Sequence, residues 1–244
     1  MAEANSIDSF APAHSASRPA RLCRGFPARS IVDLRKLLAA RFPQRSTPPT
    51  TVLPTGLAAL DRIAGGGLSK SAITEIISPQ VSAGSALIVH ALLRTARDAE
   101  QFIALIDGCD SFDPQSAATG CLPHLLWVRC RKAFEAIKAA DLLLRDGNFP
   151  FVIVDLVLNA PDELRKIPQT SWYRLQRLVE ATSTACLVIS RQSMVSSAQL
   201  KIVLENRWTL ADLENENASA RLDFRVQRSH LRSAISNQQS AIPS

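Results

Sequence analysis

Short apolar segments alternate with amphipathic ones through the middle of the chain. Five runs rich in Val, Ile and Leu predict buried strands, at 72–77, 102–106, 125–128, 151–155 and 186–190. Between them, apolar residues recur every three or four positions, which predicts helices over 85–98, 132–145, 161–166 and 170–182. In the helix predicted over 132–145, the apolar positions are Phe134, Ile137, Ala140, Leu142 and Leu144. This alternation is typical of an α/β fold with a doubly wound, mainly parallel sheet flanked by helices.

The pattern changes after the fifth strand. Segments 201–209 and 221–228 are predicted as strands without a helix between them, which indicates an antiparallel hairpin at one edge of the sheet. Arg221 and Arg225 would share one face of the last strand. Together with Arg228, they form either a surface for a partner or a solvated sheet edge, and both interpretations stay open.

The two ends of the chain lack the pattern of a folded domain. Residues 1–29 are rich in Ala, Ser, Pro and Arg without periodicity, and we expect a disordered basic arm. Residues 30–42 predict a short amphipathic helix, followed by a linker to residue 50, and its apolar face carries Leu34, Leu37 and Leu38. Such a helix must dock on its own domain or on a partner. We therefore expect a folded domain over 51–229 and a disordered tail over 230–244.

Positive charge is concentrated at the ends of the chain. The net charge is +6, and residues 1–50 carry eight Lys or Arg against three Asp or Glu. Residues 218–244 carry four against one, whereas residues 51–217 carry sixteen against eighteen. Basic ends on a nearly neutral domain fit either a solubilising role or contact with an acidic partner, which would be nucleic acid or an acidic protein face.

The composition is that of a globular chain with one core. Of its 244 residues, 46% are hydrophobic, which suffices for one α/β domain of roughly 180 residues. No apolar run is long enough to span a bilayer, and the first residues lack the apolar stretch of a secretory signal, so we expect a cytoplasmic protein without a membrane partner. Cys121, His124 and Cys130 come nearest to a metal-binding pattern, but it lacks a second half, and we expect no metal.

Residues 73–93 have the order of strand, small-residue loop and helix that a phosphate-binding loop requires. Such a loop has the pattern G-x-x-x-x-G-K-[ST], in which the Lys reaches the outer phosphates and the hydroxyl binds Mg²⁺. Residues 78–85 are SPQVSAGS, so both glycine positions hold other residues, Gly84 stands in the lysine position, and Ser85 alone fits. Because phosphoryl transfer depends on that positive charge, we expect no ATP hydrolysis and no cofactor. Weak ATP and Mg²⁺ binding stays an alternative, through the vestigial loop residues Ser82, Gly84 and Ser85 with the strand-terminal carboxylate Asp155.

A second candidate site lies on the helix predicted over 170–182. Trp172, Tyr173, Arg174 and Arg177 combine aromatic rings with guanidinium groups, which are enriched at binding hot spots and on surfaces that stack single strands. We include Trp172, Arg174 and Arg177 among the candidate partner-binding residues, with Arg225 and Arg228. Alternatively, the cluster is the ordinary flank of a helix whose leucines face the core.

Several segments, taken in order, resemble the core of the RecA recombinase. They are PTGLAALD at 54–61, GGGL at 65–68, ITEI at 73–76, ID at 106–107 with FDP at 112–114, the strand at 151–155, which resembles a Walker B strand, and RQ at 191–192. The resemblance spans about 52–209 and implies a RecA-like fold.

The departures from RecA indicate a branch that does not hydrolyse ATP. The lysine of the phosphate loop is absent, and Cys109 stands where RecA has a catalytic Glu. The DNA-binding loops of RecA correspond to two short stretches, 156–160 and 192–197. The degenerate loop, the basic arm and the segments 172–178 and 197–201 are more similar to ImuA, a RecA-like accessory protein of bacterial damage-induced mutagenesis, and the division inhibitor SulA belongs to the same branch.

This resemblance implies a non-catalytic adaptor of the DNA-damage (SOS) response that supports translesion synthesis and DNA repair through protein contacts. The partners that it implies are an inactive Y-family polymerase homologue, RecA or a replicative polymerase, with DNA contact through the basic ends left open. The alternatives are a weak DNA-dependent ATPase of the RecA type and a SulA-like inhibitor of cell division. The missing loop charge opposes the first alternative, and filamentation on overexpression would identify the second.

Overall fold

The computed structural model describes residues 51–80, 83–209 and 218–229. The predicted arm over 1–29, the predicted helix with its face of Leu34, Leu37 and Leu38, and the predicted tail over 230–244 lie outside the described residues. Those three assignments therefore stay predictions.

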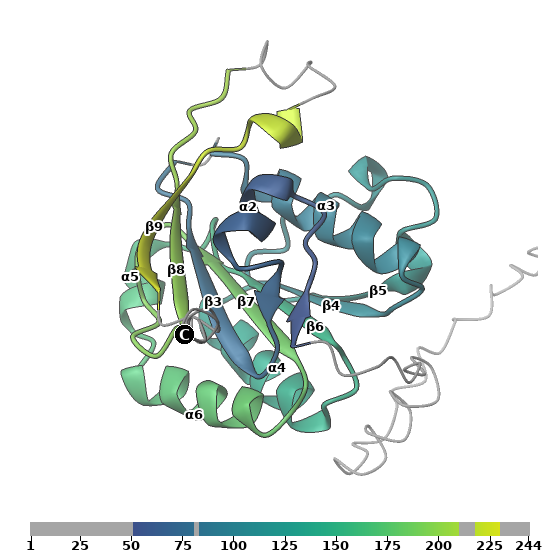
Figure 1. Cartoon of the computed structure of the whole chain (residues 1–244). Helices are drawn as coiled ribbons and strands as arrows, with labels where there is room; N and C mark the ends of the chain where they lie inside the picture. The colour runs from purple at the N-terminus through teal and green to yellow at the C-terminus, as the bar shows by residue number, and fades with distance from the viewer. Residues whose placement is uncertain (1–50, 81–82, 210–217, 230–244) are drawn as a thin grey trace, which may run out of the picture.

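One sheet organises the described residues. Its strands are β3 (Ala72–Ile77), β4 (Ile103–Asp107), β5 (Leu125–Arg129), β6 (Phe151–Asp155), β7 (Ala185–Ser190), β8 (Leu200–Leu204) and β9 (Phe224–Ser229). Within the described residues they lie in the order β5-β4-β6-β7-β3-β8-β9 (Figure 1). Neighbouring strands run parallel except β9, which pairs antiparallel with β8 at the edge. The central strands β3 and β7 are buried along their whole length, as parallel strands covered on both faces require.

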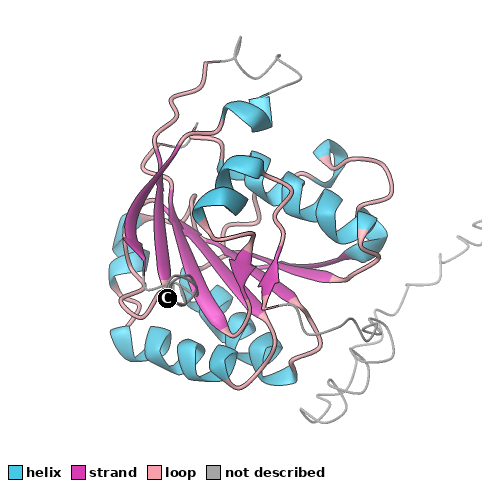
Figure 2. Ribbon diagram, viewed as in Figure 1, coloured by secondary structure: helices cyan, strands magenta, loops and turns pink. Residues whose placement is uncertain are grey.

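Helices cover both faces of the sheet (Figure 2). On one face lie α2 (Ala58–Ile63) and α3 (Ser85–Asp98), and on the other lie α4 (Ala133–Asp146), α5 (Pro161–Arg165) and α6 (Gln169–Glu180). Three short 3-10 helices are η1 (Pro114–Ser116), η2 (Leu122–His124) and η3 (Ala218–Arg221). The sheet thus separates two apolar cores, one beneath α3 around Ile88 and Leu92, the other beneath α4 and α6 around Phe149 and Trp172. In the described part of the chain, no helix is long and apolar enough to cross a membrane.

The predicted α/β architecture, mainly parallel with an antiparallel edge, is confirmed. The strands predicted at 72–77 and 151–155 have those bounds, and the other three parallel strands of the prediction differ by one residue at one or both ends. The helix predicted over 85–98 also has those bounds, and the others differ by one or two residues. Strands buried on both faces are marked by composition alone, so their positions can be predicted without knowing their neighbours.

The end of the domain differs from the prediction. β8 ends at Leu204, and η3 precedes β9, so the prediction that no helix separates the last two strands is wrong. Arg221 belongs to η3 and does not share a strand face with Arg225. The chain departs from a simple hairpin because Trp208 and Leu222 turn inward, where their side chains are 8% and 4% exposed.

The buried face of helix α4 differs in part from the predicted one. Phe134 and Leu142, which we assigned as apolar positions of this helix, are 50% and 41% exposed. The buried side chains of the helix are Ala133, Ala136, Ile137, Ala140, Leu143 and Leu144. In a helix with apolar residues on most faces, the helical period is hidden, and small alanines rather than the large Phe134 mark the inner stripe.

A small second sheet was absent from the sequence prediction. It pairs β1 (Val52–Leu53) antiparallel with β2 (Leu68–Ser69). Gly67 lies directly before β2 with φ +147°, and a Cβ at this position would lie 2.3 Å from the carbonyl oxygen of Leu53. A side chain at position 67 would therefore prevent the close approach of the two strands.

Candidate functional site

The loop between β3 and α3 occupies the position of a phosphate-binding loop, at the carboxyl end of a central strand. It is anchored where the Ser78 N–H donates to the carbonyl oxygen of Ser190 at 2.7 Å. Gly84 is the N-cap of α3 with φ +97°, and Ser85 begins the helix with a buried side chain. Ser82 lies outside the described residues. The strand and the helix start thus lie where they were predicted, and Gly84 contributes no cation at the lysine position.

Two side chains from later in the chain cover this loop, and we call Trp208 and Leu222 the loop cap. A Cβ placed on Gly84 would lie 2.6 Å from Leu222 Cδ2 and 3.2 Å from Trp208 Nε1. The same apolar cluster includes Ala83, which is fully buried, and η3 contacts α3. A lysine at position 84 would collide with the loop cap unless the cap moved. Sequence reasoning missed this contact, because nothing in the pattern brings residues 208 and 222 to the loop.

The loop cap is held by apolar packing and by a cation–π contact. The guanidinium carbon of Arg221 lies 5.5 Å from the ring centroid of Trp208. Trp208 Nε1 is buried and has no hydrogen-bond partner among the described residues. A buried unpaired N–H costs about 1–3 kcal/mol. The packing of Trp208 must therefore offset that cost.

Asp107, at the end of β4, is a structural carboxylate. Its side chain is almost fully buried and accepts the backbone N–H groups of Ser111 and Phe112, each at 2.7 Å, and of Cys109 at 3.2 Å. Trp127 Nε1 donates to it at 3.3 Å. These bonds fix the loop that follows β4. The exposed Cys109, where the resemblance places a catalytic Glu, supplies no carboxylate.

Asp155, at the end of β6, lies in register with Asp107 of β4. Its Oδ1 accepts the N–H of Val157 at 3.0 Å, so the carboxyl caps the turn that follows its own strand. Burial raises the pKa of Asp155 to about 6, and the negative charge of Asp107 adds to the rise, whereas the bond from Val157 opposes it. This carboxyl therefore has a structural partner, and its environment disfavours its charged form.

A buried ion pair between β3 and β8 was not found by sequence reasoning. Lys201 Nζ lies 2.8 Å from Glu75 Oε2, and the two side chains are 9% and 0% exposed. Glu75 Oε1 also accepts the backbone N–H groups of Met194 and Val195, at 2.5 and 2.9 Å. The pair therefore fixes the loop after β7. The sequence signal is a Glu within the apolar run AITEII and a Lys within LKIVL.

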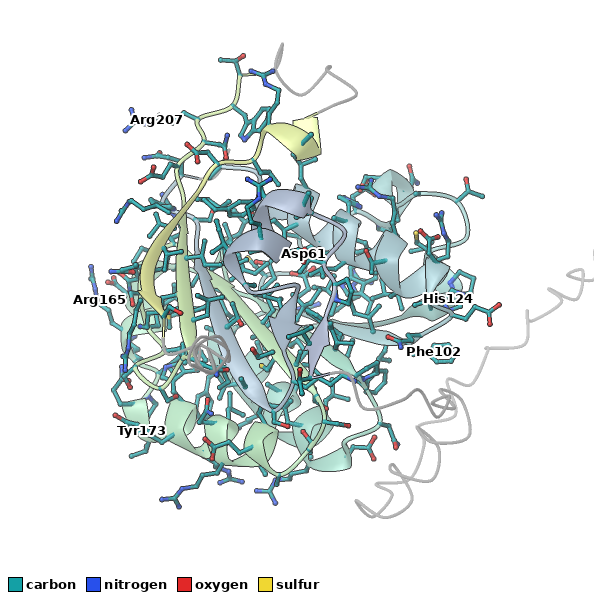
Figure 3. All side chains as sticks on the ribbon, in the orientation of Figure 1. Asp61, Phe102, His124, Arg165, Tyr173 and Arg207 are labelled. Carbon is teal, nitrogen blue, oxygen red and sulfur yellow. The ribbon has the colours of Figure 1, made fainter. Side chains whose placement is uncertain are left out.

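The aromatic and basic cluster on α6 is divided by the structure. Trp172 is fully buried, so its assignment as a partner-binding residue is wrong, because it faces the core beneath α6. Arg174 is exposed and pairs with Asp141 of α4, its Nε 2.6 Å from Asp141 Oδ1. Arg177 is exposed, and Tyr173 points outward from α6 (Figure 3). The surface of α6 thus presents one aromatic ring and two guanidinium groups.

The arginines of β9 are also exposed. Arg225 pairs with Glu205, and Arg228 Nη1 donates to the carbonyl oxygen of Ser196 at 3.0 Å. Both therefore lie on an accessible sheet edge, as the sequence predicted. The leucine face of residues 30–42 lies outside the described residues.

Comparison with known proteins gives partial matches. No family model matches the chain. RecA of Clavibacter michiganensis subsp. michiganensis is 36% identical over 112 residues, that of Streptomyces ambofaciens 30% over 120, and that of Frankia alni 32% over 120. These matches cover 45%, 48% and 48% of this chain but 31%, 32% and 34% of the RecA proteins, so it spans about a third of the length of these curated relatives. Together with the α/β fold, the partial matches place the chain in the RecA-like superfamily.

Proposed function

We propose that this RecA-like chain is a non-catalytic adaptor of the DNA-damage (SOS) response, which supports translesion synthesis and DNA repair through protein contacts. The observation that carries the proposal is the loop cap. Leu222 Cδ2 and Trp208 Nε1 lie 2.6 and 3.2 Å from the position of a Cβ on Gly84, at the place where an NTPase carries its lysine. A lysine side chain at position 84 would need the space that Leu222 and Trp208 occupy.

The chemistry of phosphoryl transfer supports the same conclusion. The transferred phosphoryl group is stabilised by positive charge, and the loop lysine is the principal protein cation in this class of site. Gly84 supplies none, and Cys109 stands in place of the catalytic Glu of RecA. The carboxyl of Asp155 is bound to its own turn, with a pKa raised to about 6 by burial. These features favour a domain that acts through contacts at its surface rather than through phosphoryl transfer.

The partners that we propose follow from the resemblance to ImuA. They are an inactive Y-family polymerase homologue, RecA or a replicative polymerase, with DNA contacted by the basic ends. Among the described residues, the candidate contacts are Arg174 and Arg177 on α6 and Arg225 and Arg228 on β9, which are exposed.

A second candidate is a nucleotide-responsive form of the same adaptor. The observation that favours it is the unpaired Nε1 of Trp208, because a cap with a buried unsatisfied donor is easier to displace than a fully bonded one. A displaced cap would expose Ser85 at the amino end of α3, where backbone N–H groups favour an anion.

Damage-induced mutagenesis in a strain that lacks this chain tests the proposed function. We expect the deletion to lower the induced mutation frequency, and both the wild type and Asp155→Asn to restore it. The double variant Arg174→Glu/Arg177→Glu is expected to restore less. An unchanged mutation frequency in the deletion strain, or failure of Asp155→Asn to restore it although the variant folds, would contradict the adaptor. Filamentation on overexpression would instead indicate a division inhibitor.

A further inference from the structure

An apolar groove lies at the amino-terminal ends of strands β4 and β6, away from the loop cap. Its volume is about 240 Å³. The residues that line it include Val52, Leu53, Leu92, Ala96, Phe102 and Phe151, from β1, α3 and the starts of β4 and β6. Val52, Ala96 and Phe102 are half-buried, and Figure 3 shows Phe102 at this side of the domain. The groove is therefore an apolar surface that the described residues leave partly open.

The described part of the chain begins at this groove. Val52 and Leu53 form one wall, and residues 1–50 precede them outside the described residues. The nearest predicted element upstream is the amphipathic helix over 30–42. The connection over 43–51 reaches at most about 30 Å when fully extended. Such a short tether holds a segment near its site at an effective concentration of millimolar order.

The apolar face of that predicted helix fits the groove in size. Leu34, Leu37 and Leu38 lie three and four positions apart, on one side of a helix. An apolar cavity of about 150 Å³ is large enough for a benzene molecule. A groove of about 240 Å³ can therefore accept more than one leucine side chain.

Acidic side chains lie beside the groove. Asp98 and Glu100 are exposed where α3 ends, next in sequence to residues that line the groove, and Asp98 pairs with Arg97 at 2.8 Å. The carboxyl end of α3 adds the negative end of a helix dipole. The predicted helix carries Arg35 and Lys36 away from Leu34, whereas Arg41, four positions after Leu37, lies on the leucine face, where it can meet this rim.

We propose that residues 30–42 dock as a helix in this groove of their own domain, with Leu34, Leu37 and Leu38 inside. The sequence leaves open whether this helix binds its own domain or a partner, and the groove at the end of its tether favours its own domain. A second copy of the chain would offer the same helix without the advantage of the tether. The docked leucines are covered, so a partner that binds them must first release the helix.

Hydrogen–deuterium exchange of the full chain tests this docking. The amide groups of residues 30–42 are expected to be protected in the wild type. Ala99→Arg changes an exposed residue that lines the groove, adding bulk and positive charge there, and should accelerate their exchange at least about tenfold. The triple variant Leu34→Asp/Leu37→Asp/Leu38→Asp should accelerate exchange across 30–42 and at half-buried Phe102. Leu158→Asp, at an exposed leucine after β6, is the matched control and should change neither.

Three outcomes would overturn the proposal. The first is rapid exchange of residues 30–42 in the wild type, and the second is protection that Ala99→Arg leaves unchanged. Protection that appears only as the protein concentration rises, with sedimentation as a dimer, would assign the groove to a second copy and also exclude docking in the same chain. The experiment contains no nucleotide, DNA or partner protein. Its failure therefore leaves the proposed function untouched, and failure of the proposed function leaves the docking intact.

Discussion

Asp155 carries a carboxyl group whose pKa is raised to about 6 by burial, compared with about 3.9 in an unfolded chain. Between these values the folded state binds the proton more tightly than the unfolded state. The stability that the protonated group contributes is thus complete below about pH 4 and is lost as the pH rises through 6. We predict that Asp155→Asn, whose amide oxygen still accepts the Val157 N–H, gains about 1–3 kcal/mol over the wild type at pH 8 and little at pH 4.

Urea unfolding at the two pH values measures this difference. Asp162→Asn is the matched control, because Asp162 has an exposed side chain on α5 and its replacement should show no comparable pH dependence. An equal effect of Asp155→Asn at pH 4 and pH 8 would show that the carboxyl is not desolvated.

Gly84 can be compared with Gly120, because both have positive φ, +97° and +80°. At Gly120 the nearest neighbour of an added Cβ is Arg97 Cδ at 3.5 Å, an ordinary contact, whereas at Gly84 it is Leu222 Cδ2 at 2.6 Å. We predict that Gly120→Ala costs about 1–2 kcal/mol of unfolding free energy through backbone strain alone. Gly84→Ala should cost about 1–3 kcal/mol more, because the loop cap must shift. Equal losses in urea unfolding would mean that the cap does not press on the loop.

At the scale of elements, the Glu75–Lys201 pair joins β3, β8 and the loop after β7. We predict that Glu75→Gln destabilises the protein by about 3–5 kcal/mol, because it leaves the buried ammonium of Lys201 without its counter-charge. Adding Lys201→Met should recover most of the loss. Urea unfolding of the single and double variants measures both effects.

The exposed pair of Asp162 and Arg165 provides the comparison for that experiment. Its side chains are 81% and 67% exposed, so Asp162→Asn should change the free energy of unfolding by less than about 1 kcal/mol. A Glu75→Gln loss no larger than this, or a double variant no more stable than the single one, would contradict the assigned role of the buried pair.

The elements that could be predicted from sequence are those marked by local pattern. β3 and β6 are continuous apolar runs, and α3 begins after a small-residue loop, so their bounds follow from periodicity alone. β9, η3 and the β1–β2 sheet depend on where distant residues pack. Trp208 leaves the path of β8 to reach the loop before α3, and no short window of sequence shows that destination.

In the candidate site, too, only the features marked by local sequence could be predicted. The missing lysine could be seen directly in SPQVSAGS, and the position of Asp155 at a strand end followed from its apolar strand. Trp172 was misassigned, because an aromatic residue beside arginines has the same sequence pattern whether it faces solvent or the core. Its burial depends on the rotation of α6 against the sheet, which is set by Leu175 and Val179 on the same stripe.

At the scale of the whole molecule, the chain has the framework of a RecA-like domain with its phosphate loop covered from within. The loop cap lies near the carboxyl ends of the strands, where open α/β sheets bind ligands. Exposed arginines lie elsewhere, on α6 and on the edge strand β9. This arrangement supports the proposed role in protein contacts rather than in a cycle of nucleotide binding and release.

Equilibrium binding of a fluorescent ATP analogue with Mg²⁺ to the full chain tests this account most directly, with a full-length RecA as the positive control. We predict no saturable binding up to millimolar nucleotide, for the wild type and for Asp155→Ala alike. Saturable micromolar binding that unlabelled ATP displaces and that Asp155→Ala abolishes would contradict the account. It would show that the loop cap opens and that the site still works as a nucleotide switch.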